Sequence, residues 1–260
     1  MFVLFAAIVL CTLMVYTLRG GMVSNRGLTV VGMDIQGLGM GVLAFVAAAW
    51  YFGPLYGVAI VLSVMIHEFG HVAAYRIAGH DDARFRLIPL MGGVAISDRA
   101  PETQAHDFFI TLMGPGICLA PMALAYALSE VIVPYSAEAA HFLWVFAIVT
   151  GALNFFNLLP FWPLDGGRCV RILIDTFAPG VTNFVTLGMS AALAAAAVAM
   201  HSMALFFFAI LGAQSLFSWS EAWVHRTPLT KPQGVLALAA YLFTAGAHFW
   251  GGLTMLMRYL

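Results

Sequence analysis

The sequence predicts an all-α polytopic membrane protein, and three observations lead to this fold class. Of the 260 residues, 62% are hydrophobic and only 9% are charged, and the mean hydropathy is +0.94. A soluble domain is about 45–50% apolar and about a quarter charged. The apolar residues form stretches that can cross a hydrocarbon core, which takes about 20 residues. No polar block between these stretches is long enough for an appended soluble domain, which usually has about 50 residues or more, so residues 1–260 are expected to form one membrane domain.

Eight apolar stretches are candidates for crossing helices, and we expect about six to eight of them to span the membrane. The first could be taken for a signal peptide, but it lacks a basic start and a small-residue cleavage pattern, so we expect it to be retained. In chain order the stretches lie near 2–18, 33–52, 56–78, 107–130, 141–159, 181–200, 203–224 and 235–257.

Lysine and arginine residues indicate the orientation, because basic residues gather in cytoplasmic loops. Of the 11 basic residues, all but Arg258 lie at or beyond the end of the first, third, fifth or seventh stretch. We therefore expect those loops in the cytoplasm and both termini outside. The net charge of −1 comes with no basic face or tail, so the expected partner is the lipid bilayer and not nucleic acid.

One polar connection of some length, from His80 to His106, contains an apolar segment at residues 87–96. Gly92 and Gly93 interrupt this segment, which indicates two short strands around a turn. Its apolarity places the hairpin at the membrane edge, where non-helical backbone must be covered by protein or line a wet cavity. The alternative is a loop that lies on the lipid headgroups.

The third stretch contains a His-Glu-x-x-His motif formed by His67, Glu68 and His71. Residues i and i+4 of an α-helix lie about 40° apart around the axis and about 6 Å apart along it, so both imidazoles can face one zinc ion. Glu68 is rotated by about 100° from His67 and can reach a metal-bound water as a general base. The spacing therefore predicts two zinc ligands and a base.

The location of this motif in a membrane helix strengthens the prediction. An ionisable residue costs at least about 2.5 kcal/mol at the centre of a membrane helix and marks a functional site by default. His67, Glu68 and His71 place three such residues within one helical turn and a half. The alternative is that neighbouring helices satisfy three polar residues without a metal.

A catalytic zinc ion usually has three protein ligands and an open position for water, so a third ligand is required. The candidate is Asp165, which follows Pro160 and Pro163 at the end of the fifth stretch and precedes Gly166 and Gly167. The distribution of basic residues places Asp165 on the same side of the membrane as the histidine motif. An alternative role for this carboxylate is a helix N-cap.

These segments together resemble the site-2 protease family of intramembrane zinc metalloproteases. The resemblance rests on His67–His71 and on Asn157-Leu-Leu-Pro-x-x-Pro-Leu-Asp165-Gly, with support from the glycine pair of the hairpin and from Gly114-Pro115. It implies a three-helix catalytic core at 56–176, with accessory helices at 1–55 and 177–260. It further implies a compact bacterial-type member without PDZ or CBS modules, in the plasma membrane with its active site toward the cytoplasm.

The resemblance also implies a function, which is cleavage of single-pass transmembrane proteins near the cytoplasmic side in regulated intramembrane proteolysis. A membrane protein partner could regulate it. The hairpin would receive the substrate as an added strand. The implied zinc ligands are His67, His71 and Asp165, the catalytic residues are Glu68 and Asn157, and the substrate-binding residues are Gly92, Gly93 and Val94.

One position departs from the family pattern, which often has Gly-Pro-x-x-Asn in the helix after the hairpin. Here the asparagine position is Cys118. A second functional class is a metal or proton transporter, since intramembrane histidine and carboxylate side chains also mark ion pathways. A third class, an inactive relative that binds membrane proteins, would lack a ligand or the base, and none of these residues is missing.

Overall fold

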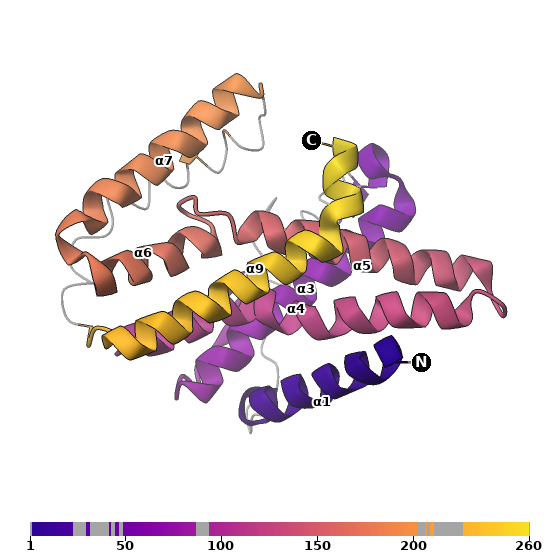
Figure 1. Ribbon diagram of the computed structural model, residues 1–260, viewed down its shortest axis with the longest axis horizontal. Coiled ribbons are helices and arrows are strands. Elements are labelled where there is room, and N and C mark those ends of the chain that lie inside the picture. Colours follow the sequence, from indigo (N-terminus) through magenta and orange to yellow (C-terminus); the bar gives the residue numbers. More distant parts are fainter. Residues whose placement is uncertain are drawn as a thin grey trace. The chain divides into compact units, whose positions relative to one another are not determined.

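Helices make up most of the described chain in the computed structural model (Figure 1). The structure describes residues 2–22, 30–31, 42, 45–46, 49–86, 94–201, 206, 209–210 and 226–259. The helices are α1 (Phe2–Met22), α3 (Pro54–Ile77), α4 (Gln104–Ile132), α5 (Ala137–Asn157), α6 (Asp165–Phe177), α7 (Thr182–Ala199) and α9 (Lys231–Tyr259), with a short 3₁₀ helix, η1 (Pro179–Val181), before α7. This composition confirms the predicted all-α fold class.

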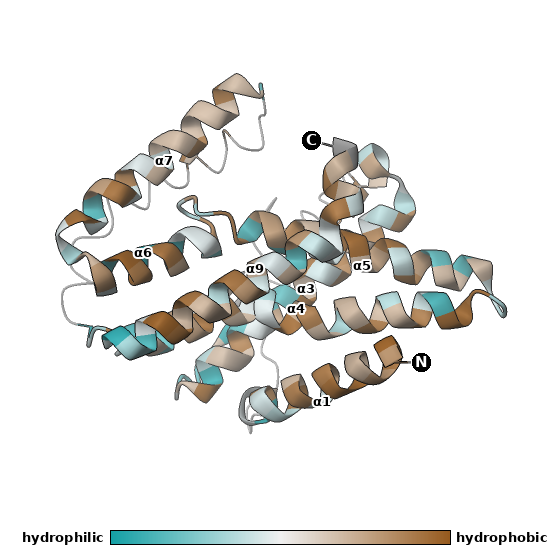
Figure 2. Cartoon of the chain, viewed as in Figure 1, coloured by the Kyte–Doolittle hydropathy of each residue, from teal (hydrophilic) through white to brown (hydrophobic). Residues whose placement is uncertain are grey.

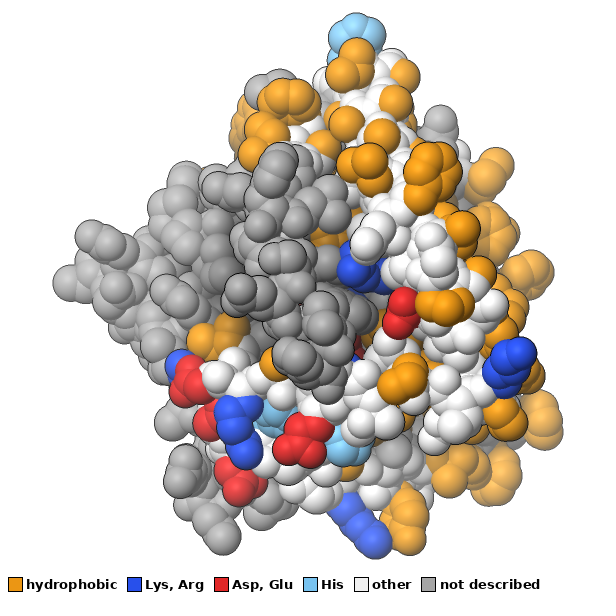
Figure 3. Space-filling view, turned by 90° about the vertical axis from the view of Figure 1, so that its left-hand side faces the viewer, with side chains coloured by type: hydrophobic (Ala, Val, Ile, Leu, Met, Phe, Trp, Pro, Cys, Tyr) orange, Lys and Arg blue, Asp and Glu red, His pale blue; other side chains and the backbone are white. Residues whose placement is uncertain are grey.

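Six helical segments of the described chain are long and apolar enough to cross a membrane, and they correspond to six of the eight predicted stretches. The two others, 33–52 and 203–224, lie largely outside the described residues. Hydrophobic residues run along the helices in Figure 2, and hydrophobic side chains cover much of the described surface in Figure 3. A surface of this kind suits lipid contact, and the chain is an integral multi-pass membrane protein.

The helix that carries the histidine motif, α3, is bounded by glycines in left-handed backbone conformations. Gly53 precedes it with a φ of 97°, and Pro54 is in its first turn. Proline has no backbone N–H, and this costs no hydrogen bond here because N–H groups of the first turn have no partner within the helix. After the helix, Gly79 has a φ of 88°. These bounds place His67 in the second half of α3, on a helix long enough to span the hydrocarbon core.

Three short strands form one sheet in the order β1 (Val30–Val31), β2 (Arg84–Arg86) and β3 (Val94–Ile96). The antiparallel pair β2 and β3 is the predicted hairpin, with Arg84 opposite Ile96. We predicted both strands within the apolar segment at residues 87–96, but β2 lies before that segment. The reason is that hydrogen bonding between backbone groups, and not the apolarity of the side chains, determines where a strand forms. Strand β1, which pairs in parallel with β2, is too short for a sequence pattern to reveal.

Polar side chains join the base of the hairpin to the turn that follows α3. Asp82 accepts hydrogen bonds from the Ser97 hydroxyl at 2.9 Å and from the backbone N–H of Asp98. Arg84 donates two hydrogen bonds to the Asp98 carboxylate, at 2.7 and 2.9 Å. His80 Nδ1 lies 2.9 Å from the same Ser97 hydroxyl. The start of β2 and the end of β3 are therefore anchored to the end of α3.

The described residues group into two compact units. The first consists of Met1–Arg99, Met113–Phe156 and Gly246–Leu260, and the second of Ala100–Leu112 and Asn157–Ala245. Helices α4 and α9 therefore contribute one end to each unit. The single domain expected from the sequence, with its catalytic core at 56–176, stays a prediction.

In the first unit, buried apolar residues of α3, α4 and α5 form the core, and α9 packs against it. Gly151 on α5 lies so close to Gly252 on α9 that a Cβ on either would overlap the backbone of the other helix. Such close backbone approach is typical of small residues at helix crossings in membranes. The buried core residues are Ala59, Leu119, Met122, Ala125, Val145, Phe146, Ala147, Ile148 and Val149.

In the second unit, a buried carboxylate joins three segments that are distant in sequence. Asp107 in the first turn of α4 is fully buried and forms ion pairs with Arg168 on α6 and with Arg226. Nearby, the Tyr241 hydroxyl on α9 donates a 2.6 Å hydrogen bond to the backbone carbonyl of Leu158. Within this unit, these polar contacts connect α6 to α4, and they connect the segment before α6 to α9.

Candidate metal centre

Helix α3 places the two motif histidines on its buried face, one turn apart. The side chain of His67 is 2% exposed and that of His71 is 9% exposed. Their Nε2 atoms lie 3.1 Å apart, and the two rings are nearly perpendicular, at 82°. This arrangement follows from the i and i+4 spacing that the sequence predicted.

The distance between the Nε2 atoms fits a shared metal ion. Two nitrogens bound to tetrahedral zinc at about 2.05 Å lie about 3.3 Å apart, close to the observed separation. Without an ion, two imidazole nitrogens 3.1 Å apart must form a hydrogen bond, in which one nitrogen carries the proton and the other accepts it. The pair His67 and His71 is therefore suited to hold a cation between the two nitrogens.

Two glycines provide the space that the His71 ring occupies. A Cβ on Gly114 of α4 would overlap the His71 imidazole, with Nε2 its nearest atom, and a Cβ on Gly70 would overlap the backbone carbonyl of Met113. Helices α3 and α4 therefore pack with their backbones close together at this level. The absent side chain at Gly114 leaves a cradle that the His71 imidazole fills.

An asparagine that the sequence analysis did not select contacts the other nitrogen of His67. Asn154 on α5 is fully buried, and its Oδ1 lies 2.7 Å from His67 Nδ1. Sequence reasoning selected Asn157, three residues later, because that residue belongs to the family motif. An amide within an apolar membrane helix was the signal that could have identified Asn154, since such polar residues usually have specific partners.

The predicted base, Glu68, contacts the hairpin. Its Oε2 accepts a hydrogen bond of 3.0 Å from the backbone N–H of Ala95 in β3. Because this N–H points to Glu68, it does not point to Phe85, the residue opposite Ala95 in β2. The outer edge of β3 therefore faces the carboxylate that follows His67 in α3.

Asp165 is the first residue of α6, and Leu164 precedes it as the N-cap residue. The alternative role of Asp165 as an N-cap is therefore wrong. The chain folds back tightly here, since a Cβ on Gly166 would overlap the carbonyl of Leu158, and one on Gly167 the carbonyl of Phe161. The Asp-Gly-Gly sequence thus reflects a need for two residues without side chains immediately after the carboxylate.

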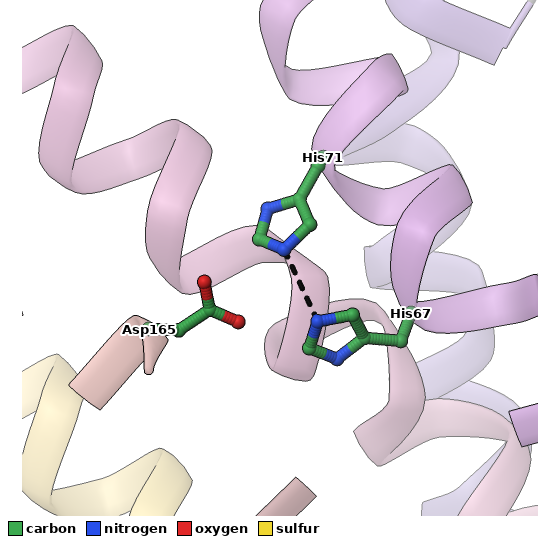
Figure 4. Close-up of side chains that lie close together, drawn as sticks. All are labelled: His67, His71 and Asp165. Carbon is green, nitrogen blue, oxygen red and sulfur yellow. Dashed lines mark hydrogen bonds between the residues drawn. The ribbon is translucent and has the colours of Figure 1, made fainter. Parts of the chain in front are cut away.

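Among the described residues, His67, His71 and Asp165 form the group that could hold a metal ion, and one ligand atom of each lies within 4.8 Å of the others (Figure 4). Asn157 is the last residue of α5 and is half-buried. Of the predicted substrate-binding residues, Val94 begins β3, and Gly92 and Gly93 lie outside the described residues. The functional roles assigned to all of these residues stay predictions.

Comparison with protein families finds a match to peptidase family M50 over residues 132–199. This segment includes all of α5 and α6 and therefore Asn154, Asn157 and Asp165, and it does not include the histidine motif. The match and the predicted motif thus concern different parts of the chain.

Two of the three curated relatives described next are named as zinc metalloproteases. The chain is 36% identical over 126 residues to putative zinc metalloprotease Rip3 of Mycobacterium tuberculosis, which covers 47% of this chain and 31% of that protein. It is 30% identical over 120 residues to stage IV sporulation protein FB of Bacillus subtilis, with 46% and 40% covered. It is 26% identical over 118 residues to zinc metalloprotease MJ0392 of Methanocaldococcus jannaschii, with 45% and 34% covered. The matched part thus spans well under half the length of these relatives.

Among solved structures, the site-2 protease from Methanocaldococcus jannaschii aligns with a TM-score of 0.46 and 18% identity, over 69% of this chain and 87% of that chain.

Proposed function

We propose that this chain, which is related to the site-2 proteases of peptidase family M50, is an intramembrane zinc metalloprotease. The observation that carries the proposal is the pair of buried Nε2 atoms 3.1 Å apart in an apolar helix, with Glu68 next to His67. Asp165 would complete the ligand set. Names of the relatives as zinc metalloproteases support the choice of metal.

The residues of this chain would divide the chemistry between them. Bound zinc supplies Lewis acidity, which polarises a peptide carbonyl and lowers the pKa of a water molecule. Glu68 would accept the proton of that water and later donate a proton to the leaving amine. Asn157 would hydrogen-bond the oxyanion of the tetrahedral intermediate. Burial of His67 and His71 keeps bulk water away from the ligands.

The proposed substrate is a single-pass transmembrane protein. A transmembrane helix satisfies its own backbone hydrogen bonds, so it must unwind locally before a peptide carbonyl can reach the site. The outer edge of β3, which faces Glu68 at Ala95, is suited to receive the unwound segment as an added strand. Val94, the first residue of β3, would contribute to this edge, and Gly92 and Gly93 are proposed with it as substrate-binding residues.

We place the site on the cytoplasmic side of a bacterial plasma membrane. The lysine and arginine distribution supports this orientation. His67 precedes the end of α3 at Ile77 by ten residues, which corresponds to a depth of about 15 Å. Cleavage is therefore expected within the membrane near its cytoplasmic surface. A membrane protein partner could regulate access to the site.

The test compares wild type with Glu68→Gln in the same membranes. The purified wild type should contain one zinc ion per chain by elemental analysis and should cleave a membrane-anchored reporter. Glu68→Gln should retain zinc and lose cleavage, because an amide cannot accept the proton of the water. Full activity of Glu68→Gln would refute the assignment of the base. Wild type without zinc would refute the proposal as a whole, and metal flux without cleavage would favour a transporter.

A further inference from the structure

We infer that Asn154 is a positioning residue that fixes the orientation and the tautomer of His67, so that Nε2 of this histidine faces the metal position. The inference rests on the metal centre of the proposed function. Its basis is the 2.7 Å contact between His67 Nδ1 and Asn154 Oδ1, both of which belong to the first compact unit. The two side chains are 2% and 0% exposed, so water does not compete for this contact.

The orientation of the Asn154 amide follows from its second partner. Its Nδ2 donates a 2.8 Å hydrogen bond to the backbone carbonyl of Thr150, one turn earlier in α5. A carbonyl can only accept, so the NH₂ group must face Thr150 and the oxygen must face His67. Asn154 is thus held in one amide orientation by its own helix.

This orientation determines which nitrogen of His67 carries the proton. Because Asn154 presents an acceptor, His67 Nδ1 must be protonated and must donate. In the neutral ring the lone pair then resides on Nε2, which lies 3.1 Å from Nε2 of His71. A metal requires a lone pair at that nitrogen. The amide on α5 therefore prepares the imidazole on α3 for binding.

Cys118 is the other described polar side chain that contacts Asn154 in this region. It lies on α4 and is fully buried. Its thiol also lies 3.9 Å from the carbonyl of Ser63, one turn before His67. A cysteine is a weak hydrogen-bonding group. Asn154 therefore contributes a strong acceptor at His67 Nδ1, and the thiol beside it contacts Asn154 and the backbone of α3.

The energetic consequence is a change in metal affinity. Groups that hydrogen-bond a metal-ligating histidine typically change affinity by about 10- to 100-fold when they are removed. Asn154→Ala removes the Oδ1 acceptor from the buried Nδ1 of His67. Both tautomers and both orientations of the His67 ring then become accessible. We expect zinc to bind about 10- to 100-fold more weakly to this variant than to wild type.

The experiment measures zinc affinity by competition with a chelator on the purified full chain, for wild type and three variants. Asn154→Ala should bind more weakly. Asn154→Asp retains an acceptor for His67 and should remain closer to wild type than the alanine variant. Thr150→Val is the matched control, since it changes a buried side chain one turn away and keeps the carbonyl that holds the amide. It should bind zinc within about twofold of wild type.

A second measurement reads the tautomer directly. Nitrogen-15 NMR of metal-free protein with labelled histidine, assigned by comparison with His67→Gln, should show His67 protonated at Nδ1 in wild type. Asn154→Ala should show an increased fraction protonated at Nε2. Protonation of His67 at Nε2 in the wild type would overturn the inference even if Asn154→Ala does not fold.

The outcomes separate this inference from the proposed function. Wild type that binds no zinc would refute the metal centre itself. Wild type that binds zinc, together with an Asn154→Ala variant of unchanged affinity and tautomer, would refute only the positioning role. Equal weakening in Asn154→Ala and Thr150→Val would show a general packing effect and would also refute it.

Discussion

Glu68 and Ala95 are joined by a 3.0 Å hydrogen bond between the carboxylate of the proposed base and the outward backbone N–H of β3. A substrate strand that adds to this edge would present its own carbonyl groups to the same N–H. The bond therefore connects the position of the base to the edge proposed to receive substrate, and the consequences can be measured without any known substrate.

Variants of Glu68 should separate its contact with β3 from its role as a base. Glu68→Gln keeps an oxygen that can accept from Ala95, so amide hydrogen exchange at Ala95 should remain close to wild type. Glu68→Ala removes the acceptor, and the same amide should exchange at least severalfold faster. Both variants should be inactive in cleavage. Equal exchange in all three proteins would contradict the importance of this contact.

Gly114→Ala should impair zinc binding. The added Cβ would overlap the His71 imidazole and displace it from the metal position. The matched control is Gly116→Ala in the same helix, where the nearest atom to the added Cβ is the flexible Met113 Sδ at 3.3 Å. Zinc content after purification should decrease in the first variant and not in the second. A full zinc complement in Gly114→Ala would show that the cradle is unnecessary.

Gly252→Leu should destabilise the crossing of α5 and α9, because even a Cβ there overlaps the backbone at Ala152. Forcing atoms into such a packed site costs about 1–3 kcal/mol or more. Gly246→Ala, on the same helix, places its Cβ where no atom lies within 4 Å and should leave stability unchanged or slightly higher. Thermal unfolding in detergent tests the pair, and equal melting temperatures would contradict the close crossing.

Asp107→Asn should be among the most destabilising polar substitutions in the second unit. It leaves Arg168 and Arg226 without their shared buried counter-charge, and breaking a buried ion pair from one side costs about 3–5 kcal/mol. Asp98→Asn is the control, since Asp98 and its partner Arg84 form an ion pair at the surface. Unfolding of both variants should show a large loss of stability only for Asp107→Asn.

The base of the hairpin should loosen in acid. Hydrogen bonds from Arg84 hold the pKa of Asp98 below its ordinary value of 3.8. Burial raises the pKa of Asp82, but hydrogen bonds from Asp98 and Ser97 outweigh burial and lower it overall. A lowered folded pKa means that the carboxylates stabilise the hairpin above their ordinary pKa, and this stabilisation is lost as the pH falls through the folded value.

This acid effect can be followed by hydrogen exchange of the Ser97 to Arg99 amides between pH 5 and 2, corrected for the intrinsic rate. Protection should be constant at the upper end and should decrease below about pH 3.8. Asp82→Asn should show lower protection at pH 5 and a smaller further decrease in acid than wild type, because only the bonds between Asp98 and Arg84 are then left to lose. A protection profile of wild type that is flat with pH would contradict the proposed anchoring.

Much of this molecule could be predicted from the order of its residues. The hydrophobic stretches indicated the spans of α1, α3, α4, α5, α7 and α9, because a helix that crosses lipid must be apolar along its whole length. The four-residue spacing of His67 and His71 indicated that both rings would share one helix face, which is a local property of the α-helix.

Contacts between segments that are distant in sequence could not be predicted in this way. The hydrogen bond between His67 and Asn154 joins residues that are 87 positions apart. The bond between Glu68 and Ala95 joins α3 to β3, and β3 pairs with β2, which lies before the apolar segment at residues 87–96. No periodicity specifies such pairs, because they depend on how closely α3, α4 and α5 pack and on the register of β2 and β3. The residues that could bind a metal were thus predictable from local spacing and residue type, whereas the neighbours that orient them follow from the packing of the helices.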